Sequence, residues 1–448
     1  MEMDQPEQPI RKKVLGIALP AIGSNLLRLL VTTVDMIMVG RLGYIQIAAV
    51  GTSNILIFLF QAIMMAIANG SMIVVANYFG KKKYEEASEV LSESAWVCII
   101  LGIVLGSIGF FFGRDALSLI TNSPEVLGEA EGYLSIVMLA MPFMFFGFLC
   151  ANVFRGAGDT VTPLWVGGIS NVLNIILDYL LIFGVHPFPA MGVRGAALGT
   201  SISFFVNSLI YLTMLLSKKS TLRIRFSLKA THLSEVFYIG LPTAVERIGI
   251  QGSNFVYTGM IGLFGEIALA AHLIGIRVEA LSFMPGFGFY TSSAVLVGQS
   301  LGSGNEKLAK RYANESMKMG IVLMGSIGVF MLIFPEILAS LFTVELEVIK
   351  LCRIYLILMG LSQVATAVDF AVTGALRGSG NTLFPMYATL FSRFLVRLPV
   401  AYLLGYTTGL GVTGVWLGMM ADMFFKAFVV YAKFRKDGFK KSRYAAQS

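Results

Sequence analysis

Residues Val31–Gly40 read VTTVDMIMVG and close an apolar run that extends from Val14 to Val39. A bilayer is spanned by about 20 apolar residues in a helix, so this run is long enough to cross a membrane. Its one acid, Asp35, lies near the end. An ionised carboxylate at this depth costs roughly 2.5–3.5 kcal/mol on insertion scales, which makes an intramembrane acid a candidate functional residue. The alternative is that Asp35 only pairs with Arg28, two turns earlier on the same helix face.

The rest of the chain has a similar composition. Of its 448 residues, 56% are hydrophobic and only 13% are charged, whereas about a quarter of the residues in soluble domains are charged. These values predict a polytopic membrane protein. The net charge of +8 does not indicate nucleic-acid binding, because the basic residues lie in short loops between apolar runs. The three histidines and three cysteines are scattered, so we expect no metal site and no bound cofactor.

The same length criterion predicts an all-α protein of twelve membrane-spanning helices, and each range is approximate. The first six are 14–38, 45–76, 88–112, 130–153, 161–184 and 191–217. The last six are 236–262, 266–298, 310–334, 348–375, 383–405 and 411–432. We therefore expect an N-terminal lobe (1–216), a basic connector (217–235) and a C-terminal lobe with a basic tail (236–448). Lysine and arginine concentrate in alternate loops, in the connector and in the tail, which predicts that both termini are cytoplasmic.

The two halves repeat at an offset of 222 positions. Leu19-Pro20 matches Leu241-Pro242, and FRGAGDT (154–160) matches LRGSGNT (376–382) at that offset. The segment GVRGAALG (192–199) resembles GVTGVWLG (411–418) after a slip of three positions. This many matches in one register indicate a duplication. Because each half has an even number of spans, the repeat is parallel, which suits two six-helix lobes that rock around a central cavity.

A second acid, Asp178, lies in the fifth span within NVLNIILDYLLIFG (171–184), one turn after Asn174. Asp35 and Asp178 should lie at similar depth, and Asn152 in the fourth span could extend the polar cluster. Two close carboxylates in a poorly solvated site cannot both ionise easily, so the pair could take up a proton on one side and release it on the other. The alternative is a hydrogen-bonded packing network.

The acid pair is not duplicated, because Asp35 and Asp178 fall on Tyr257 and Val400 at the repeat offset. The second half instead carries nearly equal numbers of acids and bases, which favours internal ion pairs. The alternative is a cation site in this half, and the residues of either arrangement include Glu246, Asp369, Arg393 and Arg397.

The chain is rich in methionine and phenylalanine, with 23 and 34 residues. Flexible thioethers and aromatic faces suit varied lipophilic cations, although helix packing and lipid contact are alternative roles. Pro142 and Pro285 are expected to interrupt the fourth and eighth spans. No phosphate-binding loop of the G-x-x-x-x-G-K-[ST] type is found, which argues against an ATP-driven enzyme. The candidate substrate-binding residues are Met64, Met65, Met141, Met144, Phe145, Tyr257, Phe283, Met284 and Phe287.

The segments VDMIMVGRLG (34–43), FRGAGDT, LRGSGNT and NVLNIILDYLLIFG together resemble the multidrug and toxic compound extrusion (MATE) family, in its DinF-like prokaryotic branch. The resemblance covers nearly the whole chain. It implies two six-helix lobes and an exchange of protons or cations for drugs. It places the family's first-helix acid on Asp35, and its fifth-helix asparagine and acid on Asn174 and Asp178. Sodium-coupled relatives use acids on the seventh and tenth helices; Glu246 and Asp369 lie there, about one turn displaced.

These features predict a monomeric multi-pass antiporter in the inner membrane of a prokaryote. It would export small lipophilic or cationic compounds as protons enter, with membrane lipid around it and no nucleic-acid partner. Sodium coupling is one alternative. Flipping of a lipid-linked precursor is another, for which Arg28, Arg393 and Arg397 would offer cationic side chains.

Overall fold

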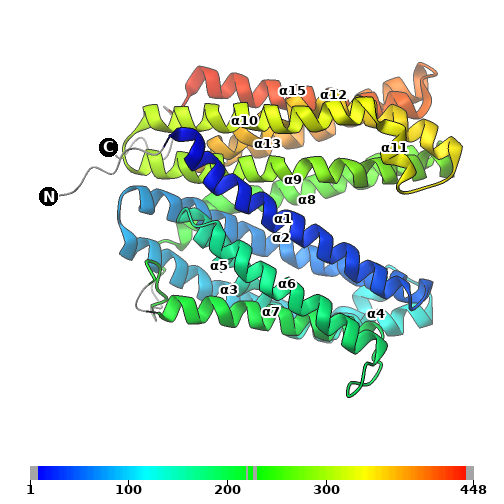
Figure 1. The fold of residues 1–448 in the computed structure, drawn as a ribbon, viewed down its shortest axis with the longest axis horizontal. Helices are drawn as coiled ribbons and strands as arrows, with labels where there is room; N and C mark the ends of the chain where they lie inside the picture. The colour runs from blue at the N-terminus through cyan, green and yellow to red at the C-terminus, as the bar shows by residue number, and fades with distance from the viewer. Residues whose placement is uncertain (1–8, 218–219, 226–229, 440–448) are drawn as a thin grey trace. The chain divides into compact units, whose positions relative to one another are not determined.

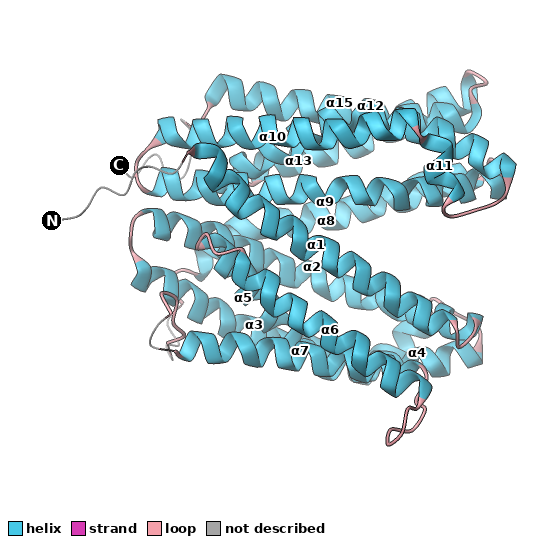
Figure 2. Ribbon diagram, in the orientation of Figure 1, coloured by secondary structure: helices cyan, strands magenta, loops and turns pink. Residues whose placement is uncertain are grey.

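The computed structural model describes residues 9–217, 220–225 and 230–439. Figure 2 shows helices and loops, and no strand is present in these residues. The predicted basic residues Lys218, Lys219 and Lys229, and the end of the basic tail, lie outside the described part.

The predicted all-α fold is confirmed, and Figure 1 shows the helices in chain order. In the first half they are α1 (Ile10–Gly40), α2 (Tyr44–Gly80), α3 (Tyr84–Ser118), α4 (Pro124–Leu139), α5 (Met141–Gly156), α6 (Val161–Phe183) and α7 (Val193–Leu216). The second half begins with α8 (Leu233–Gly262), α9 (Glu266–Gly302), α10 (Glu306–Ile333), the short α11 (Pro335–Ser340) and α12 (Leu346–Gly378). It continues with α13 (Leu383–Phe391), η1 (Ser392–Arg397), α14 (Leu398–Tyr402), η2 (Leu403–Thr407) and α15 (Gly411–Asp437).

Each predicted span corresponds to one helix or one run of joined helices. Ten of these have the length and apolarity of a membrane span, and the pair α4–α5 makes an eleventh. The remaining predicted span corresponds to α8, which has 30 residues. The sequence thus located every span; most helices extend a few residues beyond a predicted end, whereas α6 and α7 are slightly shorter than predicted.

The two prolines expected to interrupt spans behave differently. Helices α4 and α5 meet at 56°, and Pro142 lies in the first turn of α5. Because Pro142 has no backbone N–H for the carbonyl of Met138, the helix can break there at little cost. The expectation for Pro285 is wrong, because α9 continues through it without a break.

The repeated glycine-rich segments contain tight turns. Gly158 and Gly380 have φ values of 91° and 81°, which glycine adopts without strain. The next residue in each turn caps the helix that follows: Asp159 Oδ1 accepts from Val161 N at 3.1 Å, and Asn381 Oδ1 accepts from Phe384 N at 3.3 Å.

The chain forms two compact units. The N-terminal unit is Gly23–Leu241, and the C-terminal unit is Met1–Ile22 together with Pro242–Ser448. The division does not fall within the connector. The first turns of α1 belong to the C-terminal unit, and the first turns of α8 belong to the N-terminal unit.

Candidate functional site

Asp35 on α1 and Asp178 on α6 lie together in the N-terminal unit. Their carboxyl groups are close enough to interact electrostatically, Asp178 is fully buried and Asp35 is half-buried. Neither oxygen of Asp178, nor Oδ1 of Asp35, accepts a hydrogen bond from a donor group in the described chain. Two buried acceptors in contact are costly unless a proton or a cation lies between them.

Three further residues complete the surroundings of this pair. Asn174 lies beside Asp178, and its Nδ2 donates to Thr200 Oγ1 of α7 at 3.5 Å. Tyr133 of α4 is buried close to both carboxyl groups. On α7, a Cβ at Gly199 would overlap Asp178 Oδ1, so only a glycine lets this helix lie against the carboxyl group.

Sequence reasoning brought Asp35, Asp178 and Asn174 together but missed Tyr133, Thr200 and Gly199. The sequence did contain one signal for Gly199, since this residue ends the repeated segment GVRGAALG (192–199). Asn152 Nδ2 donates to Phe148 O on its own helix at 2.9 Å, and its place in the cluster stays a prediction.

The alternative pairing of Asp35 with Arg28 is not found. Arg28 Nη2 donates to Asn25 Oδ1 at 3.1 Å, and no ion pair involves Asp35 among the residues that the structure describes.

At the place that corresponds to Asp178, the C-terminal unit has an apolar residue. There, Gly418 of α15 lies directly against Ala401 of α14, which is fully buried. The two π-helical segments η1 and η2 flank α14, and a π turn accommodates an extra residue relative to an α-helix. Such an insertion is consistent with Ala401, rather than Val400, occupying the place of Asp178.

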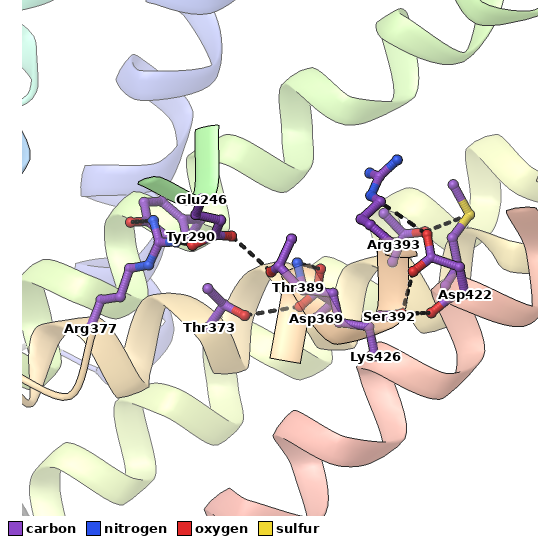
Figure 3. A network of polar contacts seen from close by, with 12 residues as sticks. Glu246, Tyr290, Asp369, Thr373, Arg377, Thr389, Ser392, Arg393, Asp422 and Lys426 are labelled. Carbon is purple, nitrogen blue, oxygen red and sulfur yellow. Dashed lines mark hydrogen bonds and ion pairs between the residues drawn. The ribbon is translucent and has the colours of Figure 1, made fainter. Parts of the chain in front are cut away.

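The acid of α8 is paired in the C-terminal unit, as Figure 3 shows. Glu246 forms an ion pair with Arg377 of the repeated LRGSGNT turn, and its Oε1 accepts from Thr389 Oγ1 at 2.8 Å. Arg377 Nη1 also donates to the hydroxyl of Tyr290 at 3.0 Å. Both oxygens of Glu246 therefore have partners.

Two other acids of this unit are also paired (Figure 3). Asp369 Oδ2 lies 2.9 Å from Lys426 Nζ, and its Oδ1 accepts from Thr373 Oγ1 at 2.9 Å. Asp422 Oδ2 lies 2.8 Å from Arg397 Nη2 and 3.6 Å from Arg393 Nε. The sequence left open whether Glu246, Asp369, Arg393 and Arg397 form ion pairs or a cation site, and the structure places all four in ion pairs. They do not form one group: Glu246 pairs with Arg377, and Asp369 pairs with Lys426. Arg393 and Arg397 both lie against Asp422. No group of three or more His, Cys, Asp or Glu side chains that could hold a metal ion occurs within the described ranges.

Glu279 of α9 has only one hydrogen-bonded oxygen. Its Oε2 accepts from the Tyr355 hydroxyl at 2.6 Å, and its Oε1 has no partner in the described chain. It forms no ion pair with its neighbour in sequence, Arg277, which is exposed.

Five of the nine candidate substrate-binding residues are buried. Of the nine, Phe287 is exposed at 38% and rests against the ring of Phe370 at 4.9 Å. Tyr257 is buried, with its hydroxyl bonded to Val415 O at 2.9 Å. Four more of these candidates are buried: Met64, Met141, Met144 and Phe145. The remaining three have intermediate exposure: Met65, Phe283 and Met284. A role of these nine residues in substrate binding stays a prediction.

The sequence profile of the MatE family matches residues 20–180 and 242–403, so each half of the repeat matches it separately. The chain belongs to the MATE family. It is therefore a multi-pass membrane transporter and not an enzyme, and its family consists of multidrug extrusion proteins.

Similar proteins and solved structures agree with this assignment. The chain is 35% identical to the "Probable multidrug resistance protein NorM" of Thermotoga maritima over 93% of its own length and 90% of that protein. It is 27% identical to the "Probable multidrug resistance protein YoeA" of Bacillus subtilis over 93% of its own length and 91% of that protein. A solved structure described as an outward-facing conformation of a multidrug resistance MATE family transporter has the same fold, with a TM-score of 0.90, 21% identity and 97% of both chains covered.

Proposed function

We propose that this MATE transporter exports small lipophilic, often cationic, compounds in exchange for protons. It works as a monomer in the cytoplasmic (inner) membrane of a prokaryote, surrounded by lipid, with both termini in the cytoplasm. The orientation rests on the excess of lysine and arginine in alternate loops. The names of the relatives, which are multidrug resistance proteins, support the substrate class.

The observation that carries the proton coupling is the Asp35–Asp178 pair, two neighbouring carboxyl groups of which three oxygens have no donor in the described chain. One proton shared by the pair satisfies both groups and leaves one negative charge. Loss of that proton leaves two adjacent charges, which repel each other and attract a cation. Proton uptake from outside would therefore weaken the binding of a cationic drug and favour its release, and proton loss to the cytoplasm would restore the binding site.

A sodium site at Glu246, Asp369 or Asp422 of the C-terminal unit is disfavoured, because these three acids already have cationic partners. Glu246, Asp369 and Asp422 each face at least one arginine or lysine within their own unit. A sodium ion would have to displace these cations before it could reach a carboxylate oxygen.

The experiment is drug efflux from proteoliposomes under an imposed proton gradient or an imposed sodium gradient. We expect the wild type to respond to the proton gradient and Asp35→Asn to show no gradient-driven efflux. Glu131→Gln is the control, because it removes a carboxylate from an exposed ion pair, with Arg114, and not from the acid pair. Normal efflux by Asp35→Asn would contradict the proposal. Efflux that follows only sodium would contradict proton coupling, and the absence of drug movement under both gradients would direct the next test to lipid-linked precursors.

A further inference from the structure

Helices α1 and α8 each belong to both compact units. The C-terminal unit includes α1 up to Ile22, and the N-terminal unit includes α8 up to Leu241. Pro20 and Pro242, which are related by the repeat, lie within two residues of these boundaries. Each unit therefore holds the first turns of a helix whose remaining turns belong to the other unit.

The contacts that hold these first turns are built twice from repeat-related residues. In the C-terminal unit, a Cβ at Gly288 would lie 2.8 Å from Ala18 O, and Ser292 Oγ donates to Val14 O at 3.2 Å. In the N-terminal unit, Gly240 lies directly against Ala66 O, and Gly70 lies directly against Val236 O. The pairs 18/240, 66/288, 14/236 and 70/292 all obey the offset of 222. In both units, helix backbones make close contact at equivalent positions.

In the N-terminal unit, Glu93 of α3 binds the residues that lead into α8. Glu93 is 3% exposed, and its carboxylate accepts from Thr231 N at 3.1 Å and from His232 N at 2.8 Å. His232 Nδ1 lies 3.2 Å from Glu93 Oε1. Hydrogen bonds from backbone N–H groups to a buried carboxylate are among the stronger ones in proteins. This contact fixes the point at which the connector becomes α8.

The connector is held to the same helix further upstream. Ser88 Oγ accepts from Arg223 N at 3.2 Å, and Ser92 Oγ accepts from Arg225 N at 2.8 Å. The described part of the connector therefore lies along α3 and leads to Glu93.

The repeat mate of Glu93 is Glu315 of α10, and it binds the start of α1 in the C-terminal unit. Arg11 Nε donates to Glu315 Oε1 at 2.6 Å. Arg11 is the repeat mate of Leu233, the residue directly after His232. The Arg11 side chain is 77% exposed, and an exposed pair contributes little stability. The same glutamate position thus anchors the first turn in both units, strongly through Glu93 and weakly through Glu315.

We propose that Glu93 and Glu315 are positioning residues for transport, which keep the first turns of α8 and α1 on their units while the transporter changes conformation. The proposal rests on the transport function proposed above. Among the described residues, α1 and α8 are the two helices that are divided between the compact units. Glu315 and Glu93 hold the cytoplasmic ends of these two helices. The contacts of Glu93 and Glu315 described above do not include Asp35 or Asp178, so the two glutamates should govern turnover and not drug affinity.

The first test separates turnover from binding. We expect Glu93→Gln to lower the maximal rate of drug efflux in proteoliposomes by about tenfold, and Glu315→Gln by less, while the Kd of the drug stays unchanged. Glu85→Gln is the matched control: Glu85 is also on α3 and pairs with Arg225 of the connector at 2.9 Å, but it does not contact the start of α8. Normal rates in both anchor variants, or equal losses in Glu85→Gln, would overturn the proposal.

Rescue distinguishes positioning from general damage. In Arg11→Glu and Glu315→Arg two like charges would meet, so each single variant should transport more slowly, and the double variant should recover the rate. Failure of the double variant to recover while it remains folded would contradict the anchoring role of Glu315.

Hydrogen exchange tests the anchors without any transport. In Glu93→Gln the backbone amides of residues 231–236 should exchange faster, while those of α1 keep their wild-type rates. In Glu315→Gln the change should be confined to residues 10–22. If the wild type moves no drug, the proposed function is refuted, but the hydrogen-exchange measurement still tests the two glutamates. If the wild type transports drug and the variants exchange their amides at wild-type rates, only the proposed role of Glu93 and Glu315 is refuted. If Glu93→Gln does not fold, the Glu315 variants decide the proposal.

Discussion

The two units share a repeated scaffold, but their buried acids differ in their partners. In the N-terminal unit, Asp35 and Asp178 face each other, and Asp178 has no donor in the described chain. In the C-terminal unit, Glu246 and Asp422 each face a buried arginine. The repeat mate of Glu246 is Ser24, and the place of Asp178 is taken by Ala401, so neither arrangement exists in the other unit.

This difference separates two uses of buried charge. A buried ion pair holds its helices in place, and removal of one partner leaves the other charge uncompensated. An acid pair without a donor is unfavourable in the ionised state and changes its energy with each proton bound or released. The C-terminal unit therefore has the features of a support, and the N-terminal unit has those of a site that responds to protons.

We expect the largest effect from the variant Asp178→Asn, which should lose proton-driven transport. The amide cannot release a proton but can donate to Asp35, so proton-driven drug efflux should fall to the level of empty vesicles. The same change removes a buried charge without a donor, so the melting temperature in detergent should stay equal or rise. A substantial proton-driven efflux, or a large fall in melting temperature, would show that Asp178 is a packing residue like the acids of the C-terminal unit.

Glu246→Gln should have the opposite pattern. It leaves the buried Arg377 without its counter-charge, which costs about 3–5 kcal/mol of stability when one partner of a buried pair is removed. Thermal unfolding in detergent should show the loss, and the double variant Glu246→Gln/Arg377→Met should recover much of it. If the single variant is as stable as the wild type but loses drug efflux, the C-terminal unit contributes directly to coupling and the contrast between the units fails.

The sequence was informative where a signal was local. Asp35 stands alone in an apolar run, and Asn174 and Asp178 are one helical turn apart, so both halves of the acid pair could be found. The twelve spans followed from length and apolarity. The partner of Glu246 could not be read in this way, because Arg377 is 131 residues away and adjacent Arg247 is the nearer candidate.

Packing also set a limit on prediction from sequence. Tyr133 reaches the acid pair from a helix that no polar pattern singled out, and the abundance of methionine could not distinguish a drug site from a core. Pro285 was expected to break α9, but a proline inside a long membrane helix is tolerated when neighbouring groups take up the freed carbonyl. Only the contacts between helices resolve such cases.

A smaller effect is expected from one methyl group placed at the two equivalent helix contacts. Gly199→Ala would push Asp178 out of place, so we expect reduced proton-driven efflux and a modest loss of stability. Gly418→Ala would instead press against Ala401, and overpacking of this kind costs about 1–3 kcal/mol. Efflux assays normalised to the amount of folded protein should therefore separate the two variants. Equal specific activity in both would mean that the position of Asp178 tolerates displacement.

The smallest effect should come from the exposed ion pair between α3 and α4. Arg114 Nη1 lies 2.5 Å from Glu131 Oε2, with the side chains 62% and 40% exposed. Water and salt screen such a pair, so Arg114→Gln should change stability by at most about 1 kcal/mol and leave proton-driven efflux unchanged. Melting curves at low and high salt should overlap for this variant and the wild type. A loss as large as that of Glu246→Gln would show that burial is not what distinguishes the ion pairs of the C-terminal unit, and the contrast between the units would then need another physical cause.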